Sequence, residues 1–319
     1  MWLKTRMFLL VAVLFAILYG VIVWIGNLMG VGNAIFYLVL ALGFLGLQYL
    51  IGPSLVGWTM RVRWVTEEQE PDLHRMVAEL AQEAKLPKPK VGISEMAIPN
   101  AFAYGRTQRD GRICVTRGIL NILNRDELKA VLGHEMSHIR HRDMAIITLL
   151  SAIPMILYWV ASSFMWGFGG RRDRGSYAAL IGIAALVLYF VTNLLVMYGS
   201  RIREYYADFG SYELGNRPQH LANALYKLTQ ASNRPGVKEE MKKADAVKAF
   251  FVTDPARASM EVRELAQIDR GQKGVITYDD LMDLRQKEVH VSFGASLGEL
   301  FMTHPNMVKR IKHLSTLVA

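Results

Sequence analysis

The chain has 319 residues, a formal net charge of +9, 52% hydrophobic residues and a mean hydropathy of +0.18. Its single cysteine, Cys114, excludes an intrachain disulfide and any metal site built from several cysteines. The basic residues gather beside apolar runs and form no stripe interleaved with aromatics, which argues against a nucleic-acid partner and for a lipid bilayer.

Long apolar runs organise the chain. Each is long enough to cross a bilayer as a helix, and they occupy 7–25, 34–57, 144–168 and 177–198. The first could be a signal peptide, but it lacks a clean cleavage site and a second run follows closely, so we expect a retained span. We therefore predict two transmembrane hairpins, within 1–60 and 144–198.

The basic residues that flank these runs predict the orientation. Three lie in the 169–175 loop, whereas eight lie on the opposite side. This bias places both termini and the soluble segments in the cytoplasm of a multi-pass cell-membrane protein. The eight are Lys4, Arg6, Arg61, Arg63, Arg140, Arg142, Arg201 and Arg203, and the three are Arg171, Arg172 and Arg174.

Two soluble segments, 61–143 and 199–319, follow the hairpins. In the first, apolar spacing predicts a helix over 67–85, and short strands are expected at 90–94, 101–104 and 112–116, with a turn at 109–111. The second reads as mostly helical, with a helical insert at about 232–299. The expected fold is mainly α with a small β-sheet.

One motif carries chemistry. His134, Glu135 and His138 form H-E-x-x-H, preceded by Asn124 as a helix N-cap and by Glu127 three residues later, as in a capping box. Residues four apart share a helix face, so both imidazoles can bind one zinc ion while Glu135 acts as general base. The alternative is a pair of surface histidines beside a carboxylate.

A catalytic zinc site needs a third protein ligand. From His138 to the middle of the 169–175 loop is about 33 residues, and from there to Glu204 about 33 again, so a helical hairpin returns Glu204 to the level of the histidines. Asp208, one turn further on, is placed to accept a hydrogen bond from a ligand imidazole. The alternative is that both acids pair with Arg201 and Arg203.

Further segments extend the pattern. H-E-x-x-H, the apolar hairpin and the stretch 200–208 are joined by Pro99-Asn-Ala-Phe-Ala-Tyr-Gly105 and by Thr303-His-Pro305 with Arg310-Ile311. Together they resemble the HtpX-type membrane metalloproteases, which are gluzincins related to the CAAX prenyl proteases. The resemblance implies four transmembrane helices and a zincin-like catalytic domain at the membrane surface.

The resemblance also implies roles for single residues. His134, His138 and Glu204 would bind one zinc ion, Glu135 would activate water, and Asp208 would support a ligand. An edge strand would pair with the substrate backbone, although an ordinary sheet strand remains the alternative. His304 is a candidate for stabilising the oxyanion, or else a helix-start or packing residue, and Arg310 is a weaker candidate. The strand residues are Asn100, Ala101, Phe102, Ala103 and Tyr104.

The leading hypothesis is thus a zinc endopeptidase that cleaves misfolded or membrane-proximal polypeptides, with membrane-protein quality control implied by the resemblance. One alternative is a scaffold or substrate-holding protein whose metal only joins two helices, but three ligands leave a site open, whereas structural zinc sites are closed. Another is a metal transporter, for which Gln48 and Asn193 provide too few polar residues within the apolar runs.

One stretch departs from this pattern. Residues 269–280 have the outline of a calcium-binding loop, with Asp269 first and Asp280 last. Calcium also needs oxygen ligands at positions three and five, where Gly271 and Lys273 stand. We predict a helix–loop–helix without calcium.

Overall fold

The computed structural model describes residues 34–165, 177–243, 258–269, 271, 274–287 and 298–318. The chain divides into two compact units, one within Met1–Ile51 and Ala145–Ile202 and the other within Gly52–Met144 and Arg203–Ala319. Three long helices have residues in both units: α2 (Ala34–Thr59), α6 (Asp143–Met165) and α7 (Tyr177–Glu213).

The described part of the first unit consists of apolar helices. Leu150, Ile153 and Leu157 of α6 cluster with Val196 of α7. Among the described residues, two stretches are long and apolar enough to cross a membrane. Ala145–Ser162 lies within the expected third span, and Ala179–Glu213 overlaps the expected fourth span but continues beyond residue 198. Residues 34–57 are helical but are not among these stretches, and 7–25 lies outside the described residues. Four spans therefore remain a prediction.

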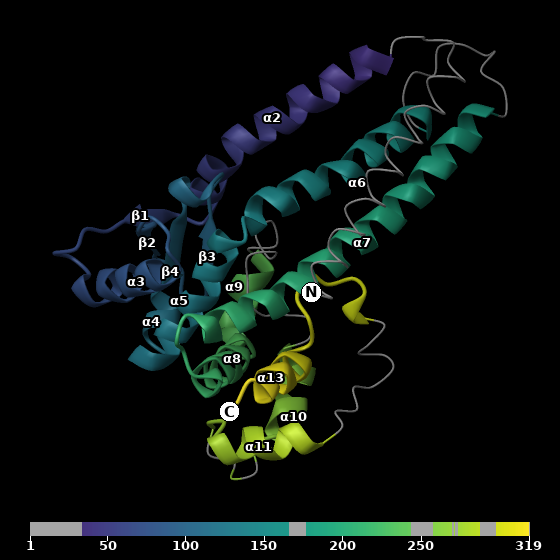
Figure 1. Ribbon diagram of the computed structural model, residues 1–319. Helices are drawn as coiled ribbons and strands as arrows, with labels where there is room; N and C mark the ends of the chain where they lie inside the picture. Colours follow the sequence, from purple (N-terminus) through teal and green to yellow (C-terminus); the bar gives the residue numbers. More distant parts are fainter. Residues whose placement is uncertain are drawn as a thin grey trace. The chain divides into compact units, whose positions relative to one another are not determined.

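A four-stranded sheet forms one layer of the second unit (Figure 1). Three strands match the predicted ranges: β2 (Lys90–Ser94), β3 (Ala101–Tyr104) and β4 (Arg112–Thr116). The fourth, β1 (Val62–Trp64), was not predicted, because three residues are too few to show an alternating pattern. The order is β1-β2-β4-β3, so β3 is an edge strand, antiparallel to β4.

The sheet buries both faces. On one face Ala101 and Ala103 of β3 join the main core with residues of the helices. On the other, Phe102, Tyr104 and Cys114 form a smaller cluster with residues of α2 and α9. This division follows from the alternation of side chains along a strand.

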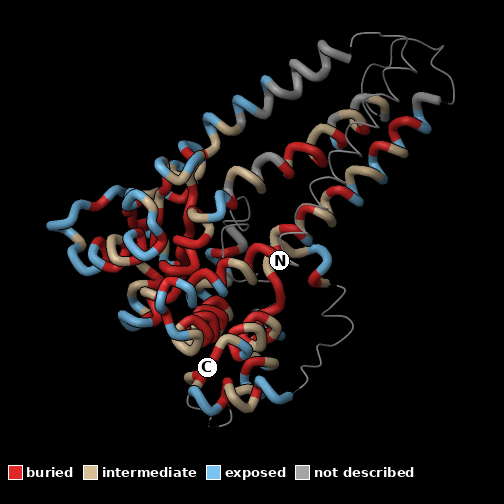
Figure 2. Tube along the Cα trace, in the orientation of Figure 1, coloured by how far each residue is buried: buried red, intermediate tan, exposed pale blue. Residues whose placement is uncertain are grey.

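Helices complete the second unit. The helix expected over 67–85 is α3 (Pro71–Glu83); it begins at a proline, whose missing N–H is tolerated in the first turn. A 3-10 turn, η1 (Gln108–Asp110), lies at the expected turn. Figure 2 shows that α8 is buried along most of its length. The other helices are α4 (Arg117–Leu120), α5 (Arg125–Arg140), α8 (Pro218–Ser232), α9 (Pro235–Lys243), α10 (Ala258–Ala266), α11 (Tyr278–Gln286) and α13 (Met307–Thr316).

The start of α5 is fixed in place by the expected capping box. Asn124 Oδ1 accepts a hydrogen bond from the amide of Glu127 (2.9 Å), and Glu127 Oε2 accepts one from the amide of Asn124 (3.0 Å). Glu127 is buried and also accepts two hydrogen bonds from Lys227 of α8, at 2.7 and 2.9 Å. The carboxylate of Glu127 therefore caps α5 and also joins it to α8.

Small residues let α5 approach the C-terminal part of α7 closely. A Cβ added to Gly210 would lie 2.1 Å from Ser137 Oγ, and one added to Gly133 would lie 2.3 Å from Asn216 Nδ2. Side chains on the two facing helix surfaces can therefore meet within a few ångströms.

The segment 269–280 joins α10 to α11, as a helix–loop–helix requires. Asp269 Oδ2 accepts hydrogen bonds from the amide of Gly274 (2.8 Å) and from Tyr226 Oη (3.3 Å). Asp280 forms a capping box with Thr277 at the start of α11. Both carboxylates thus stabilise the loop and the helix start.

Candidate metal centre

The two histidines of H-E-x-x-H face each other on α5. Their rings are nearly perpendicular, with centroids 4.8 Å apart, and the two Nε2 atoms are separated by 3.2 Å. His134 is buried, and the side chain of His138 is 15% exposed. The i and i+4 spacing therefore directs both Nε2 atoms to one point.

Glu204 of α7 faces the same point. Its Oε2 lies 3.6 Å from His134 Nε2, and its Oε1 lies 3.6 Å from His138 Nε2. Ligand atoms of the three residues all lie within 4.8 Å of one another. The structure thus brings together the three residues expected from H-E-x-x-H and the returning hairpin.

Each imidazole is oriented through its other nitrogen. Asp208 Oδ1 lies 2.9 Å from His134 Nδ1, and Asp143 Oδ2 lies 2.6 Å from His138 Nδ1. Because an ionised carboxylate only accepts hydrogen bonds, each neutral ring carries its proton on Nδ1 and presents the Nε2 lone pair to the other ring.

Two lone pairs that face each other repel unless a cation lies between them. In tetrahedral zinc sites with Zn–N bonds of 2.0–2.1 Å, the nitrogens are about 3.3 Å apart, close to the spacing here. Two imidazole nitrogens and a carboxylate oxygen also suit zinc chemically. The residues therefore fit the metal. Burial would lower the pKa of His134, but Asp208 and Glu204 raise it to about 10.

Arg310 of α13 is a larger part of the site than the sequence indicated. Its side chain is only 1% exposed. Its Nε and Nη2 donate hydrogen bonds to the two oxygens of Asp208, at 3.0 and 2.6 Å, and Nη1 lies 3.0 Å from Glu204 Oε2. Burial alone would lower the pKa of Arg310, but these two carboxylates raise it. The guanidinium thus holds Glu204, a candidate ligand, and Asp208, which orients His134.

Asp143 was not predicted. It lies at the start of α6, buried beside His138, and its other oxygen forms an ion pair with the buried Arg203. A signal existed in the sequence, because Asp143 is an acid between the motif helix and an apolar run, and Arg203 adjoins the third candidate ligand. Both ligand histidines are therefore held by a carboxylate that is itself paired with an arginine.

Glu135 lies near both ligand histidines and near the edge strand. It is 5% exposed, and the amide of Ala103 in β3 donates a hydrogen bond to its carboxylate. Burial raises the pKa of Glu135 above its ordinary value, against the opposing effect of His138 and His134. The carboxylate thus lies between the metal ligands and the edge strand.

The predicted substrate strand lies at the edge of the sheet. Asn100 donates its amide hydrogen to Thr116 Oγ1 (2.8 Å), which fixes the beginning of β3 beside β4. All residues from Asn100 to Tyr104 are buried in this structure, and Met241 of α9 packs in the same cluster as Phe102. The opposite edge of β3 pairs with no other strand of the described sheet.

His304 lies next to the cluster. Its Nδ1 is 3.3 Å from Glu204 Oε2, and its side chain is 23% exposed. Neither ring nitrogen makes a hydrogen bond within the part of the chain that the structure describes. The N-cap of α13 is Asn306, so His304 precedes the helix start.

Comparison with known proteins identifies the family. The model of peptidase family M48 matches residues 67–318. A protease HtpX homolog of Methanothermobacter thermautotrophicus is 53% identical over 226 residues, covering 71% of this chain and 85% of the relative. A protease HtpX homolog of Moorella thermoacetica is 32% identical and covers 99% and 94%.

Among solved structures, Ste24p of S. mikatae aligns with a TM-score of 0.50 and 14% identity, covering 98% of this chain. That likeness concerns the fold alone, and this chain spans only 64% of that protein. The family match and the identities of the curated relatives settle the assignment. The chain belongs to peptidase family M48, as one of its HtpX-type metalloproteases.

Proposed function

We propose that this metalloprotease is a membrane-embedded endopeptidase that binds one zinc ion through His134, His138 and Glu204. The observation that carries the proposal is the pair of Nε2 atoms 3.2 Å apart, each made a lone-pair donor by a carboxylate on Nδ1. Three ligands leave a coordination position for water, as catalytic zinc requires.

Glu135 acts as the general base. When bound, zinc would polarise the scissile carbonyl and lower the pKa of the attacking water. Glu135 takes the proton from this water, and burial, which raises the pKa of the carboxyl, helps it keep the proton until the leaving amine accepts it. Asp208 and Asp143 hold the imidazoles in the tautomer that binds metal.

His304 is the residue best placed to donate a hydrogen bond to the developing oxyanion. Its ring lies beside Glu204 and, among the described residues, makes no hydrogen bond. Arg310 is less suitable because it is almost fully buried and its nitrogens face Asp208 and Glu204. This difference favours His304 for electrostatic stabilisation of the intermediate.

The edge strand β3 supplies the substrate site. An extended peptide would pair with the backbone of Asn100–Tyr104 on the side away from β4, beside Glu135, which contacts the Ala103 amide. Such pairing reads main chain more than side chain, so unfolded and membrane-proximal polypeptides are the expected substrates. This substrate class is consistent with a role in membrane-protein quality control.

The enzyme is proposed to span the cell membrane several times, with its site and both termini in the cytoplasm. Support comes from the apolar helices α6 and α7 and from the bias of basic residues. In this arrangement 1–60 and 144–198 form the membrane hairpins, and 61–143 and 199–319 form the two halves of the catalytic domain.

The proposal is tested by Glu135→Gln in the full chain, purified in detergent and supplied with zinc. We expect one zinc ion per chain in both proteins and a loss of casein cleavage of about 10²–10⁴-fold in the variant. Glu83→Gln, at an exposed position of α3, is the matched control. Undiminished cleavage by Glu135→Gln would exclude Glu135 as the general base. A wild-type protein that binds zinc but cleaves no casein would favour a scaffold in which the metal only joins two helices.

A further inference from the structure

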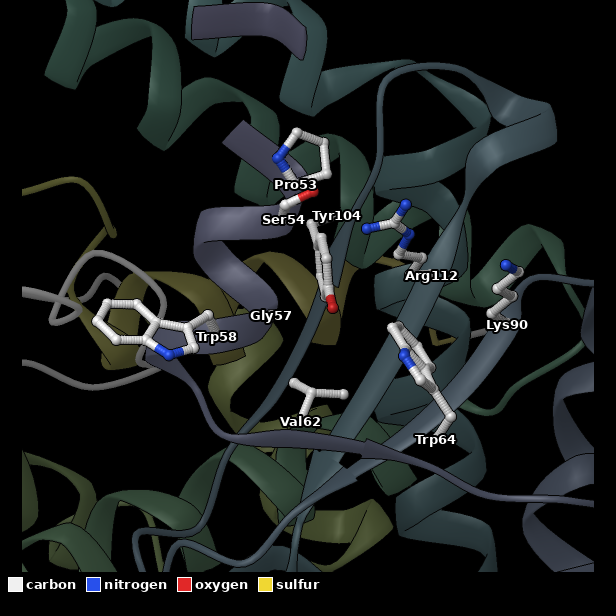
Figure 3. A pocket seen from close by; sticks show the side chains of 9 residues that line it. All are labelled: Pro53, Ser54, Gly57, Trp58, Val62, Trp64, Lys90, Tyr104 and Arg112. Atoms are coloured by element: carbon white, nitrogen blue, oxygen red, sulfur yellow. The ribbon is translucent and has the colours of Figure 1, made fainter. Parts of the chain in front are cut away.

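A cavity of about 340 Å³ lies outside the metal centre, between the C-terminal end of α2 and the sheet. Figure 3 shows Tyr104 in its middle, with Trp64, Arg112 and Lys90 to one side and Trp58 to the other. Tyr104 belongs to β3, but its ring lies on the sheet face opposite that of Ala103, which packs in the main core. The cavity is therefore separate from the proposed chemistry.

The cavity is lined by hydrogen-bond donors and by positive charge. The Arg112 guanidinium lies 5.4 Å from the centroid of Tyr104 and 5.9 Å from that of Trp64. Its Nη2 donates to Asp110 (3.0 Å), whereas its buried Nε has no hydrogen-bond partner within the described residues. Lys90 also lines the cavity, and its side chain is exposed.

Two further features restrict the ligand. The Tyr104 hydroxyl is buried with no hydrogen-bond partner among the described atoms. Burial raises its pKa, so it remains a donor at neutral pH. The single carboxylate of Asp110 is shared between Arg112 and Arg106 (3.1 Å), so the group of three side chains keeps a net positive charge. Two cations and a hydroxyl donor around one cavity fit a phosphate group.

The surroundings of the cavity point to a lipid as the source of that phosphate. Trp58 is 80% exposed and Trp64 46% exposed, as indoles are where a protein meets the membrane interface. Leu55, near the C-terminal end of α2, is 55% exposed and lies one helical turn before Trp58. An acyl chain could lie along this face.

We infer that the cavity binds the phosphate headgroup of an anionic phospholipid, with Arg112, Lys90 and Tyr104 as donors and with an acyl chain along α2. The inference rests on the proposed membrane location. It is independent of the proposed roles at the metal centre.

Calorimetric titration of the detergent-solubilised full chain tests this site. The probes are dihexanoyl phosphatidylglycerol, dihexanoyl phosphatidylcholine and inorganic phosphate. We expect the anionic lipid to bind at least about tenfold more tightly than the other two, and Lys90→Gln to weaken it about fivefold, the loss expected for one cation near a headgroup. Lys85→Gln, at another exposed lysine, is the matched control and should change nothing.

Arg112→Gln should weaken binding of the anionic lipid at least as much. Lys90→Gln decides the test, because the side chain of Lys90 is exposed and does not support the fold. Equal binding of the two lipids, equal binding of inorganic phosphate, or an unchanged affinity in Lys90→Gln would each overturn the inference. Zinc content and casein cleavage, measured on the same preparations, report separately on the proposed function.

Discussion

Replacement of Asp143 by asparagine tests how His138 is held at the metal centre. In the wild type one carboxylate oxygen lies 2.6 Å from His138 Nδ1, and the other forms an ion pair with Arg203. Asparagine keeps one acceptor and replaces the other oxygen with a donor. Either His138 or Arg203 then faces an amide NH₂ group, in a place where both Asp143 and Arg203 are buried.

Two losses of different size follow. Loss of a supporting carboxylate lowers metal affinity about 10–100-fold, which corresponds to about 1.4–2.8 kcal/mol. Leaving the Arg203 guanidinium buried without its partner lowers the free energy of unfolding by about 3–5 kcal/mol. Adding Arg203→Met to Asp143→Asn should recover much of the stability but not the metal affinity, because His138 still has a neutral acceptor.

Zinc affinity is measured by competition with a chromophoric chelator, and stability by thermal unfolding of the metal-free protein. Asp72→Asn is the matched control, since that side chain is 70% exposed on α3. Zinc affinity within twofold of wild type in Asp143→Asn would refute the orienting role. Recovery of zinc affinity in the double variant would show that Arg203, and not Asp143, controls the site.

Three other changes probe the surroundings of the cluster. Arg310→Met leaves Asp208 buried without its cation and should lower the free energy of unfolding by about 3–5 kcal/mol; a thermal unfolding curve like that of wild type would contradict this. Gly210→Ala places a methyl group 2.1 Å from Ser137 Oγ, so we expect a loss of about 1–3 kcal/mol, partly restored by Ser137→Gly; an equal loss in the double variant would exclude this contact as the cause. Because Asp208 and Glu204 raise the pKa of His134 to about 10, zinc must displace a proton from this ring at pH 7. The affinity for zinc should therefore fall about tenfold for each unit by which the pH is lowered below this pKa. Calorimetry in buffers of different ionisation enthalpy should show about one proton released per zinc, and no release would contradict the assigned proton.

Local patterns predicted much of the second unit. The three longer strands match their expected ranges because each alternates or is bounded by turn residues, and the capping box at Asn124 was visible as a side-chain spacing. The position of Glu204 followed from helix rise, since equal descending and returning lengths bring it level with the histidines. These features could be predicted because they depend on residues that are close in sequence or on the number of residues in a helix.

Long-range pairing escaped prediction. Arg310 lies 102 residues from Asp208, and nothing between them fixes the path of the chain that brings the two together. Arg203 was interpreted as a basic residue beside an apolar run, because that is where membrane proteins usually carry positive charge, and its partner Asp143 was not predicted. The close approach of α5 and α7 at Gly210 is likewise not revealed by any sequence periodicity.

Metal content and zinc affinity of the wild type beside Glu204→Gln test the account most directly. Glu213→Gln, an exposed acid on the same helix, serves as the control. The account predicts one zinc ion per chain in wild type and control, and a large loss of affinity with loss of casein cleavage in Glu204→Gln. Full zinc occupancy at wild-type affinity in Glu204→Gln would contradict the three-ligand site and the hydrolytic mechanism built on it.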